Sequence, residues 1–190
     1  MRSLTYYIGT TIDGFIAGPG GEFDFLPLAE DVLAYIGEEY PETLPTHARG
    51  HFGLADAPNR RFDTVVMGRG TYEPGLAIGA TSPYRHLRQY VVSGTIAEIA
   101  DPEVALVPDD PVGLVRRLKK EDGLGIWLCG GGQLAGALLP EIDELVIKQY
   151  PIVAGAGIPM LAGAFRPTPF TLTGSRTFAS GAAVLTYTRT

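Results

Sequence analysis

The segment from Ile126 to Leu139 reads I-W-L-C-G-G-G-Q-L-A-G-A-L-L and combines an apolar run, a bare turn and a helical pattern. The first four residues are uninterruptedly apolar, which is typical of a strand covered on both faces. Three glycines follow, and Leu134 and Leu138 then recur at helical spacing before Pro140. We therefore predict a buried strand over 126–129, a glycine turn, and a short helix that proline closes.

Two further apolar runs end in turns of the same kind. Residues 64–67 lead into Gly68-Arg69-Gly70-Thr71, and residues 90–92 lead into Ser93-Gly94-Thr95. In an open α/β sheet the carboxyl ends of parallel strands line the ligand crevice. Glycine lets a ligand approach the backbone, and a helix start offers free N–H groups to a phosphate. Tight packing explains each turn alone equally well, but the three turns together predict a dinucleotide site.

The glycine spacing of an ordinary NAD-binding fold is absent. Residues 129–136 read C-G-G-G-Q-L-A-G, lack the G-x-G-x-x-G pattern and lie late in the chain. No acidic residue follows at the distance that ribose binding requires. Arg69, in contrast, adds a fixed positive charge beside the predicted phosphate site. The pattern indicates a different dinucleotide-binding architecture.

The rest of the chain alternates strand and helix patterns, as in an α/β fold. Further strands are predicted over 4–8, 15–16, 104–107 and 145–152. Residues 28–40 carry one apolar helix face that ends before Pro41. Asp110 as N-cap and Pro111 as first helical residue predict another helix, which Gly123 follows.

The pattern changes towards the C-terminus. Residues 153–169 are rich in Gly and Pro, and two extended runs over 170–178 and 183–189 then flank Ser180-Gly181. This spacing predicts an antiparallel hairpin. We therefore expect a three-layer α/β/α fold in which a mostly parallel sheet ends in that hairpin. Residues 1–190 are predicted to form a single domain, since no linker or low-complexity tract interrupts them.

Composition narrows the function class. The 190 residues are 45% hydrophobic and 19% charged, which is typical of a globular chain. A net charge of −6 argues against non-specific binding to nucleic acid or anionic membranes. The single cysteine, Cys129, excludes an intrachain disulfide and a cysteine-based zinc site. No signal peptide or membrane-length apolar run is found, so we expect a cytoplasmic protein with a small-molecule substrate.

Six segments occur in the order of one known family. They are TTIDGFIAG (10–18), FDFL (23–26), VVMGRGTYE (65–73), YVVSGT (90–95), IWLCGGGQLAGALL (126–139) and IDELVIKQYPIVAGAGIPM (142–160). With them the chain resembles the dihydrofolate reductase superfamily, and more closely the C-terminal reductase domain of the bacterial bifunctional riboflavin deaminase-reductase. The resemblance spans almost the whole chain, and it implies the dihydrofolate reductase-like fold and an NADPH site.

The resemblance assigns most of that site to backbone groups. The implied phosphate and ribose contacts are Gly68, Arg69 and Thr71, then Ser93, Gly94 and Thr95 near the adenosine ribose and its 2′-phosphate, and Gly130, Gly131 and Gly132 with the N–H groups of Gln133 and Leu134 at the pyrophosphate. The implied lid over the nicotinamide contains Thr11, Asp13, Gly14 and Ile16. In the family, the first two glycines of the triplet are often joined by a cis peptide bond.

Two roles that the resemblance implies, proton delivery to the substrate and binding of the cofactor 2′-phosphate, have no clear residue in this sequence. Folate enzymes carry an acid on the first helix for proton delivery, and here Asp31 is our candidate, with Glu30 beside it. A solvated helix face explains either acid equally well, and a buried carboxyl with a raised pKa would favour the catalytic role. The turn after the third strand lacks the basic residue that usually pairs with the 2′-phosphate. Arg69, Arg85 and Arg88 remain as candidates for that contact.

Other reactive residues favour ordinary roles. His47 and His51 are four apart, as metal ligands on a helix are, but residues 41–61 contain prolines and no helical period. We therefore expect a long loop there and no metal site. Cys129 is expected to be a small core residue rather than a nucleophile, and Trp127 to be core.

The resemblance predicts an NADPH-dependent reductase of a small heterocycle. The most similar named activities are 5-amino-6-(5-phosphoribosylamino)uracil reductase and dihydrofolate reductase. One alternative is a nucleotide-binding dimer of the same fold without turnover, and another is a flavin or deazaflavin reductase. The family often pairs through its C-terminal sheet, and residues 153–169 are apolar for a loop, so a homodimer is expected.

Overall fold

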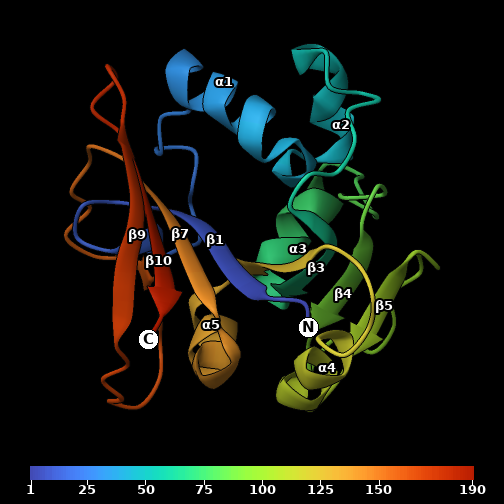
Figure 1. Cartoon of the computed structure of the whole chain (residues 1–190). Coiled ribbons are helices and arrows are strands. Elements are labelled where there is room, and N and C mark those ends of the chain that lie inside the picture. Colours follow the sequence, from blue (N-terminus) through green and yellow to red (C-terminus); the bar gives the residue numbers. More distant parts are fainter.

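A computed structural model describes residues 1–190 and places helices on both sides of one large sheet (Figure 1). The strands of this sheet are β1 (Leu4–Thr10), β3 (Phe62–Gly68), β4 (Arg88–Val92), β5 (Val104–Val107), β6 (Gly125–Gly130), β7 (Glu144–Gln149), β9 (Phe170–Thr177) and β10 (Ala183–Arg189). A small second sheet pairs β2 (Phe15–Ala17) with β8 (Ile158–Pro159). The helices are α1 (Glu30–Glu39), α2 (Thr46–Arg49), α3 (Arg69–Ala77), α4 (Pro111–Leu118) and α5 (Gly132–Leu138), with short 3₁₀ turns η1 (Pro41–Thr43), η2 (Gly50–Phe52) and η3 (Leu139–Glu141).

The large sheet is mixed, as predicted. Its strand order is β5-β4-β3-β6-β1-β7-β10-β9. All neighbours from β5 to β7 are parallel, whereas β10 pairs antiparallel with both β7 and β9. The C-terminal hairpin therefore forms one edge of an otherwise parallel sheet.

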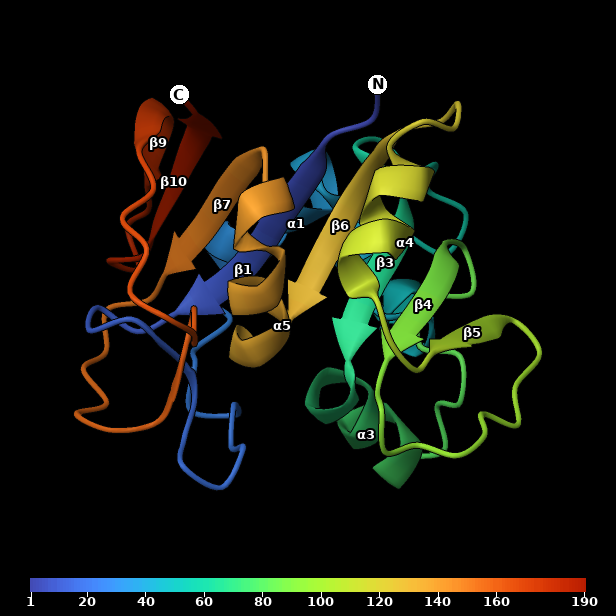
Figure 2. The same cartoon turned by 90° about the horizontal axis from the view of Figure 1, so that it is seen from below.

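Side chains alternate between two cores along each strand. Leu4, Tyr6 and Leu128 pack towards α4 and α5 on one face. Tyr7 and Trp127 pack on the opposite face, where α1 lies. Figure 2 shows α4 and α5 in front of the sheet with α1 behind it, which gives the predicted three layers. No helix of the fold is long and apolar enough to cross a bilayer.

Helix α4 forms as its local signals predict. The Asp110 carboxylate accepts a hydrogen bond from the Gly113 N–H at 2.8 Å, which caps the helix start. Leu114, Val115 and Leu118 are buried against the sheet. Capping and burial thus agree, and the helix follows its sequence signals closely.

The region over 41–61 differs from the expected long loop, because it contains η1, α2 and η2. A tertiary contact organises it. The side chain of Glu42 is fully buried, and its carboxylate accepts hydrogen bonds from the N–H groups of Arg61 at 2.7 Å and Phe62 at 2.8 Å. No helical period records such a contact between an early turn and the start of β3.

Two element boundaries are also corrected. Helix α1 begins at Glu30, after the extended residue Ala29, rather than at Leu28. Strand β7 ends at Gln149 rather than at residue 152. Pro151 has no N–H group for a strand ladder, so the apolar run outlasts the strand.

Candidate cofactor-binding site

The three glycine turns lie together at the carboxyl ends of three neighbouring parallel strands. Strands β4, β3 and β6 are consecutive parallel neighbours, so their carboxyl ends point the same way (Figure 2). A Cβ atom placed on Gly68 would lie 3.5 Å from the Gly130 oxygen and the Gly131 nitrogen. The strand ends that were predicted to share a ligand are therefore in contact.

Each glycine of the triplet has a different reason to lack a side chain. Gly130 has a φ of 129°, a backbone conformation that disfavours other residues. A Cβ atom on Gly132 would clash with the carbonyl oxygen of Pro159. A Cβ atom on Gly131 would meet only Thr71 Oγ1 at 3.9 Å and Ile16 Cδ1 at 4.0 Å. Gly131 is thus the glycine that borders open space.

The peptide bond between Gly130 and Gly131 is cis, as the resemblance implied.

Two helices begin at this edge without side-chain caps. Helix α3 starts after Gly68 and α5 after Gly131, and neither N-cap residue supplies a side-chain hydrogen bond. The first N–H groups of a helix have no partner inside the helix, so they are available to an anion. In α5 these include the N–H groups of Gln133 and Leu134, although the Leu134 side chain packs in the core. Such donors fit the phosphates of a dinucleotide.

Two side chains add to the backbone donors. Thr71 carries a hydroxyl group beside the Gly130–Gly131 turn and makes no side-chain hydrogen bond within the protein. Arg69 is exposed, and its Nη1 donates to Thr95 Oγ1 at 3.2 Å. The guanidinium therefore spans from the turn after β3 to the turn after β4.

The turn after β4 is built by its own serine. Ser93 is buried, and its Oγ accepts hydrogen bonds from the N–H groups of Thr95 at 3.2 Å and Ile96 at 3.1 Å. A Cβ atom on Gly94 would approach the Pro108 carbonyl oxygen at 3.4 Å. Of the three predicted ribose contacts, Thr95 is the one with an exposed side chain next to Arg69.

The predicted lid is tied to a distant segment. Asp13 Oδ1 accepts hydrogen bonds from the Thr11 hydroxyl at 2.6 Å and the Ala154 N–H at 3.0 Å, and Oδ2 accepts one from the Gly155 N–H at 2.7 Å. These bonds, that of Thr11 foremost, lower the pKa of Asp13 to about 2. Gly14 has a φ of 85°, and its oxygen accepts a hydrogen bond from the Met160 N–H at 2.9 Å.

The lid also reaches the glycine turn, because Ile16 Cδ1 lies 4.0 Å from the Cβ position of Gly131. Asp13 thus positions the loop, and Ile16 is the lid residue that lines the site.

Strands β1 and β6 separate beside the site. Their pairing ends at Tyr6 and Leu128, whereas β1 stays paired with β7 as far as Thr10. On its other side β6 stays paired with β3 as far as Gly130. The carboxyl halves of β1 and β6 therefore diverge next to the glycine turn.

Two arginines proposed for the 2′-phosphate lie elsewhere. Arg88 is the first residue of β4, at the opposite end of the strand from Ser93, and its Nη2 binds Glu121 at 2.7 Å. Arg85 lies near Asp101 at 3.6 Å and Glu103 at 3.7 Å. Of the three candidate cations, only Arg69 stands at the glycine turns.

The structure gives Asp31 the surroundings of a solvated helix face. Its carboxylate accepts hydrogen bonds from the N–H groups of Ser180 at 2.9 Å and Val32 at 2.8 Å. These contacts, that of Ser180 foremost, lower the pKa of Asp31. A proton donor at neutral pH needs the opposite shift.

Sequence reasoning missed Lys148, which lies in β7. Its side chain is partly buried, and Nζ lies 3.5 Å from the centre of the Tyr7 ring. Burial lowers the pKa of Lys148 to about 7. The signal was a single charged residue in the apolar run L-V-I-K-Q-Y over 145–150.

Cys129 has the surroundings of an ordinary core residue, whereas the two histidines lie in helical turns rather than in the expected loop. Cys129 packs against the core on the α1 side, and burial raises the pKa of its thiol to about 12, so it stays protonated. His47 lies in α2 and His51 in η2. No cluster of three or more His, Cys, Asp or Glu side chains with metal-ligand geometry is found. Trp127 is core, as predicted.

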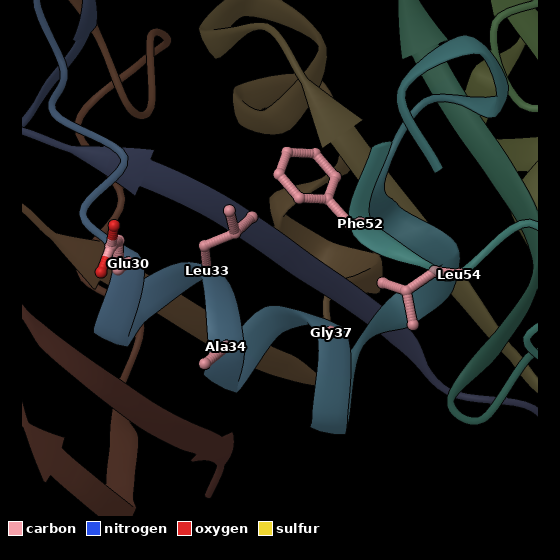
Figure 3. A pocket seen from close by; sticks show the side chains of 6 residues that line it. All are labelled: Glu30, Leu33, Ala34, Gly37, Phe52 and Leu54. Carbon is pink, nitrogen blue, oxygen red and sulfur yellow. The ribbon is translucent and has the colours of Figure 1, made fainter. Parts of the chain in front are cut away.

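A separate cavity of about 390 Å³ lies between α1 and the segment after α2 (Figure 3). Six residues line it: Glu30, Leu33, Ala34, Gly37, Phe52 and Leu54. Leu33 and Phe52 point into it from opposite sides in Figure 3, and none of the glycine turns contributes to its wall. The cavity is mostly apolar and is distinct from the predicted cofactor site.

Known proteins match this chain over nearly its whole length. The family model described as the RibD C-terminal domain matches residues 2–184. Two relatives from Bacillus subtilis strain 168, both described as uncharacterized, cover nearly the whole chain. YwjB is 32% identical over 93% of this chain and 92% of its own length, and YyaP is 26% identical over 98% and 95%.

Two solved structures share the fold. The crystal structure of a putative riboflavin biosynthesis protein from Shewanella sp. PV-4 has a TM-score of 0.73 and 24% identity, with 100% of this chain and 99% of that chain covered. A Thermotoga maritima diaminohydroxyphosphoribosylaminopyrimidine deaminase/5-amino-6-(5-phosphoribosylamino)uracil reductase has a TM-score of 0.66 and 14% identity. The alignment covers 100% of this chain and 57% of the Thermotoga chain.

Proposed function

Because this chain belongs to the RibD C-terminal domain family, we propose that it is an NADPH-dependent reductase of a small heterocyclic substrate. The observation that carries the proposal is that the three glycine turns lie at the carboxyl ends of neighbouring strands, where the turns after β3 and β6 touch and Arg69 joins the turns after β3 and β4. Backbone donors, two uncapped helix starts and one guanidinium converge there. This donor set suits an elongated ligand with separated phosphates.

The chain's own residues divide the proposed cofactor contacts. The N–H groups that begin α5 and the Thr71 hydroxyl would hold the pyrophosphate beside Gly131. Arg69 and Thr95 would bind the 2′-phosphate, since they are the exposed polar pair at the β3 and β4 turns. Bound NADPH would supply a hydride. Ile16 would help to exclude water from the reacting rings.

The substrate class is proposed from the family and from the cavity beside α1. The Thermotoga protein of the same fold is named for reduction of 5-amino-6-(5-phosphoribosylamino)uracil, a ring-bearing ribosylamine. We infer a related heterocycle as substrate here. Leu33, Phe52 and Leu54 offer an apolar wall for a part of the substrate that does not react.

The test is turnover with a defined panel. Purified protein is mixed with NADPH and either 5-amino-6-(5-phosphoribosylamino)uracil or dihydrofolate, and absorbance at 340 nm is followed. We expect loss of absorbance with the aminouracil. The reductase proposal is contradicted if absorbance stays constant with both compounds and also with a broader set of flavins and deazaflavins.

A second function has one observation in its favour. Asp31, the acid on the first helix, has a lowered pKa and is occupied by backbone donors, so the folate-type proton donor is missing. The chain would then be a nucleotide-binding dimer without turnover. NADPH binding with a defined Kd in the absence of any turnover favours this alternative.

A further inference from the structure

Lys148 occupies an unusual place on the sheet. Its Cα pairs with Gly9 of β1 on one side and with Val184 of β10 on the other. The space beside Gly9 is taken by the Tyr150 ring, since a Cβ atom on Gly9 would lie 3.0 Å from Tyr150 Cε2, and Lys148 extends instead towards Tyr7. Its Nζ lies 3.5 Å from the centre of the Tyr7 ring. Lys148 therefore lies over the part of β1 that has separated from β6.

The ammonium group has no anionic partner. No carboxylate lies within ion-pair distance of Lys148 Nζ, and no protein acceptor forms a hydrogen bond with it. Lys119, in contrast, binds Asp143 at 2.7 Å and the Glu141 carbonyl oxygen at 2.6 Å. The Tyr7 ring offsets part of the cost of the charge, and the N–H groups of Lys148, which have no protein acceptor, are available to a ligand.

The groups around Lys148 do not replace that acceptor. The titratable and charged side chains on this face include Tyr7 of β1, Cys129 of β6, Tyr84 before β4, Glu144 of β7, Tyr150 after β7, Tyr35 of α1, Tyr40 after α1 and Arg176 of β9. The phenols and the thiol have pKa values raised by burial, so they are neutral at pH 7.

The charged groups nearby are also engaged or distant. Glu144 binds the Thr5 hydroxyl at 2.9 Å, four residues before Lys148 in the same strand. Arg176 covers the Tyr35 ring at 4.9 Å and is itself a cation. From α1, Asp31 binds the Ser180 N–H and Glu39 binds Arg61. None of these carboxylates therefore pairs with the Lys148 ammonium.

We propose that Lys148 is the proton donor of this enzyme and faces the heteroatom of the substrate that is reduced. The proposal rests on the reductase function proposed above. Bound NADPH would supply the hydride to the substrate carbon, and the electron pair of the C=N or C=O bond would then move to the heteroatom. That atom forms a bond with a proton from Lys148 Nζ, and the neutral amine recovers a proton from solvent. One hydride and one proton are thus added across the double bond.

The acid strength of Lys148 suits this role. Burial lowers the pKa of its ammonium to about 7, so the group can release and regain a proton near neutral pH. The protonated form prevails below that value. The rate is therefore expected to fall as the pH rises through about 7.

One test needs no turnover. The chain contains only three lysines, Lys119, Lys120 and Lys148, so ¹³C-lysine NMR shows few signals. The Lys148 signal is assigned from its loss in Lys148→Met. We expect it to titrate near pH 7, well below the ordinary lysine value of about 10.4. We also expect it to shift when NADPH and 5-amino-6-(5-phosphoribosylamino)uracil are added. A titration near the ordinary lysine value, or no shift with ligands, overturns the proposal.

The second test separates proton donation from charge. In Lys148→Met we expect kcat to fall by about 10²- to 10⁴-fold, with the Kd for NADPH unchanged within twofold. Lys148→Arg keeps the charge but does not titrate near neutrality, so it is expected to restore less than a tenth of kcat. Lys120→Met is the matched control, because Lys120 is exposed just after α4, which packs on the opposite face of the sheet. Restoration of kcat by Arg, or an unchanged pH profile in Lys148→Met, refutes the role as proton donor.

Failure of the two proposals can be told apart. If the wild-type protein binds NADPH but reduces no heterocycle, the proposed function is wrong. The role of Lys148 as proton donor then falls with it, and the NMR ligand shift shows only whether Lys148 lies beside the bound ligands. If the wild-type protein turns over and Lys148→Met does so equally well, the function stands and the inference about Lys148 falls.

Discussion

Arg69 Nη1 lies 3.2 Å from the Thr95 hydroxyl oxygen, and this contact joins the turns that follow β3 and β4. Arg69 also lies 3.6 Å from Glu73 on its own helix, and both side chains are more than half exposed. Exposed ion pairs of this kind contribute little to stability. The guanidinium therefore adds little to the stability of the fold at this position.

The first prediction concerns cofactor preference. Arg69→Ala is expected to weaken NADPH binding about 10- to 100-fold, because a hydrogen-bonded charge contributes about 1.5–3 kcal/mol. NADH lacks the 2′-phosphate and should lose much less affinity. Fluorescence titration with both cofactors measures the difference, with Arg85→Ala as control. Equal losses for the two cofactors would move Arg69 to the pyrophosphate.

The second prediction concerns the open glycine. Gly131→Val is expected to abolish NADPH binding while unfolding remains cooperative, because the new side chain enters open space rather than the core. Gly132→Val is the contrasting variant, since its side chain meets the Pro159 carbonyl oxygen and should lower Tm. Calorimetry and cofactor titration are the measurements. Unchanged NADPH affinity in Gly131→Val would remove Gly131 from the site.

A third prediction tests the helix acid. Asp31→Asn is expected to leave kcat within about twofold, because its carboxylate binds the Ser180 and Val32 N–H groups and has a lowered pKa. Steady-state rates at pH 6 and pH 8 measure this. A loss of two orders of magnitude in kcat would make Asp31 the proton donor after all.

The fourth prediction concerns the lid. Asp13 has a folded-state pKa of about 2, below its ordinary value of 3.8, so the carboxylate stabilises the fold above pH 3.8 and this contribution is lost as the pH falls towards 2. Asp13→Ala should therefore lower Tm at pH 7 and less so near pH 2. The same substitution frees the loop from Ala154 and Gly155, so KM should rise while the overall fold is kept. A Tm difference that is independent of pH would contradict this account.

The fifth prediction concerns self-association. Val153, Ile158 and Phe165 are exposed apolar residues in the segment before the C-terminal hairpin, and Phe165 is almost fully exposed at 96%. A homodimer through this region is expected in light scattering at micromolar concentration. Phe165→Glu should shift the mass towards a monomer without lowering Tm. A wild-type monomer at that concentration would exclude the dimer.

Local sequence signals predicted several turns and helix and hairpin positions of this fold. The glycine turns, the proline-started α4 and the hairpin around Gly181 each depend on residues close in sequence, and the structure contains all of them. Their backbone conformations follow from missing side chains, fixed φ angles and capping groups. The family resemblance added the order of the segments and the cis bond at Gly130.

The tertiary structure decided what lies beside what. Arg69 and Arg88 were both candidates for the 2′-phosphate contact. Arg88 is the first residue of β4, however, and so lies at the opposite end of that strand from the turn that Arg69 contacts. Lys148 and Tyr7 are 141 positions apart and meet because β1 and β7 pair in register. Strand order and register arise from the burial of many distant side chains at once, which no local pattern records.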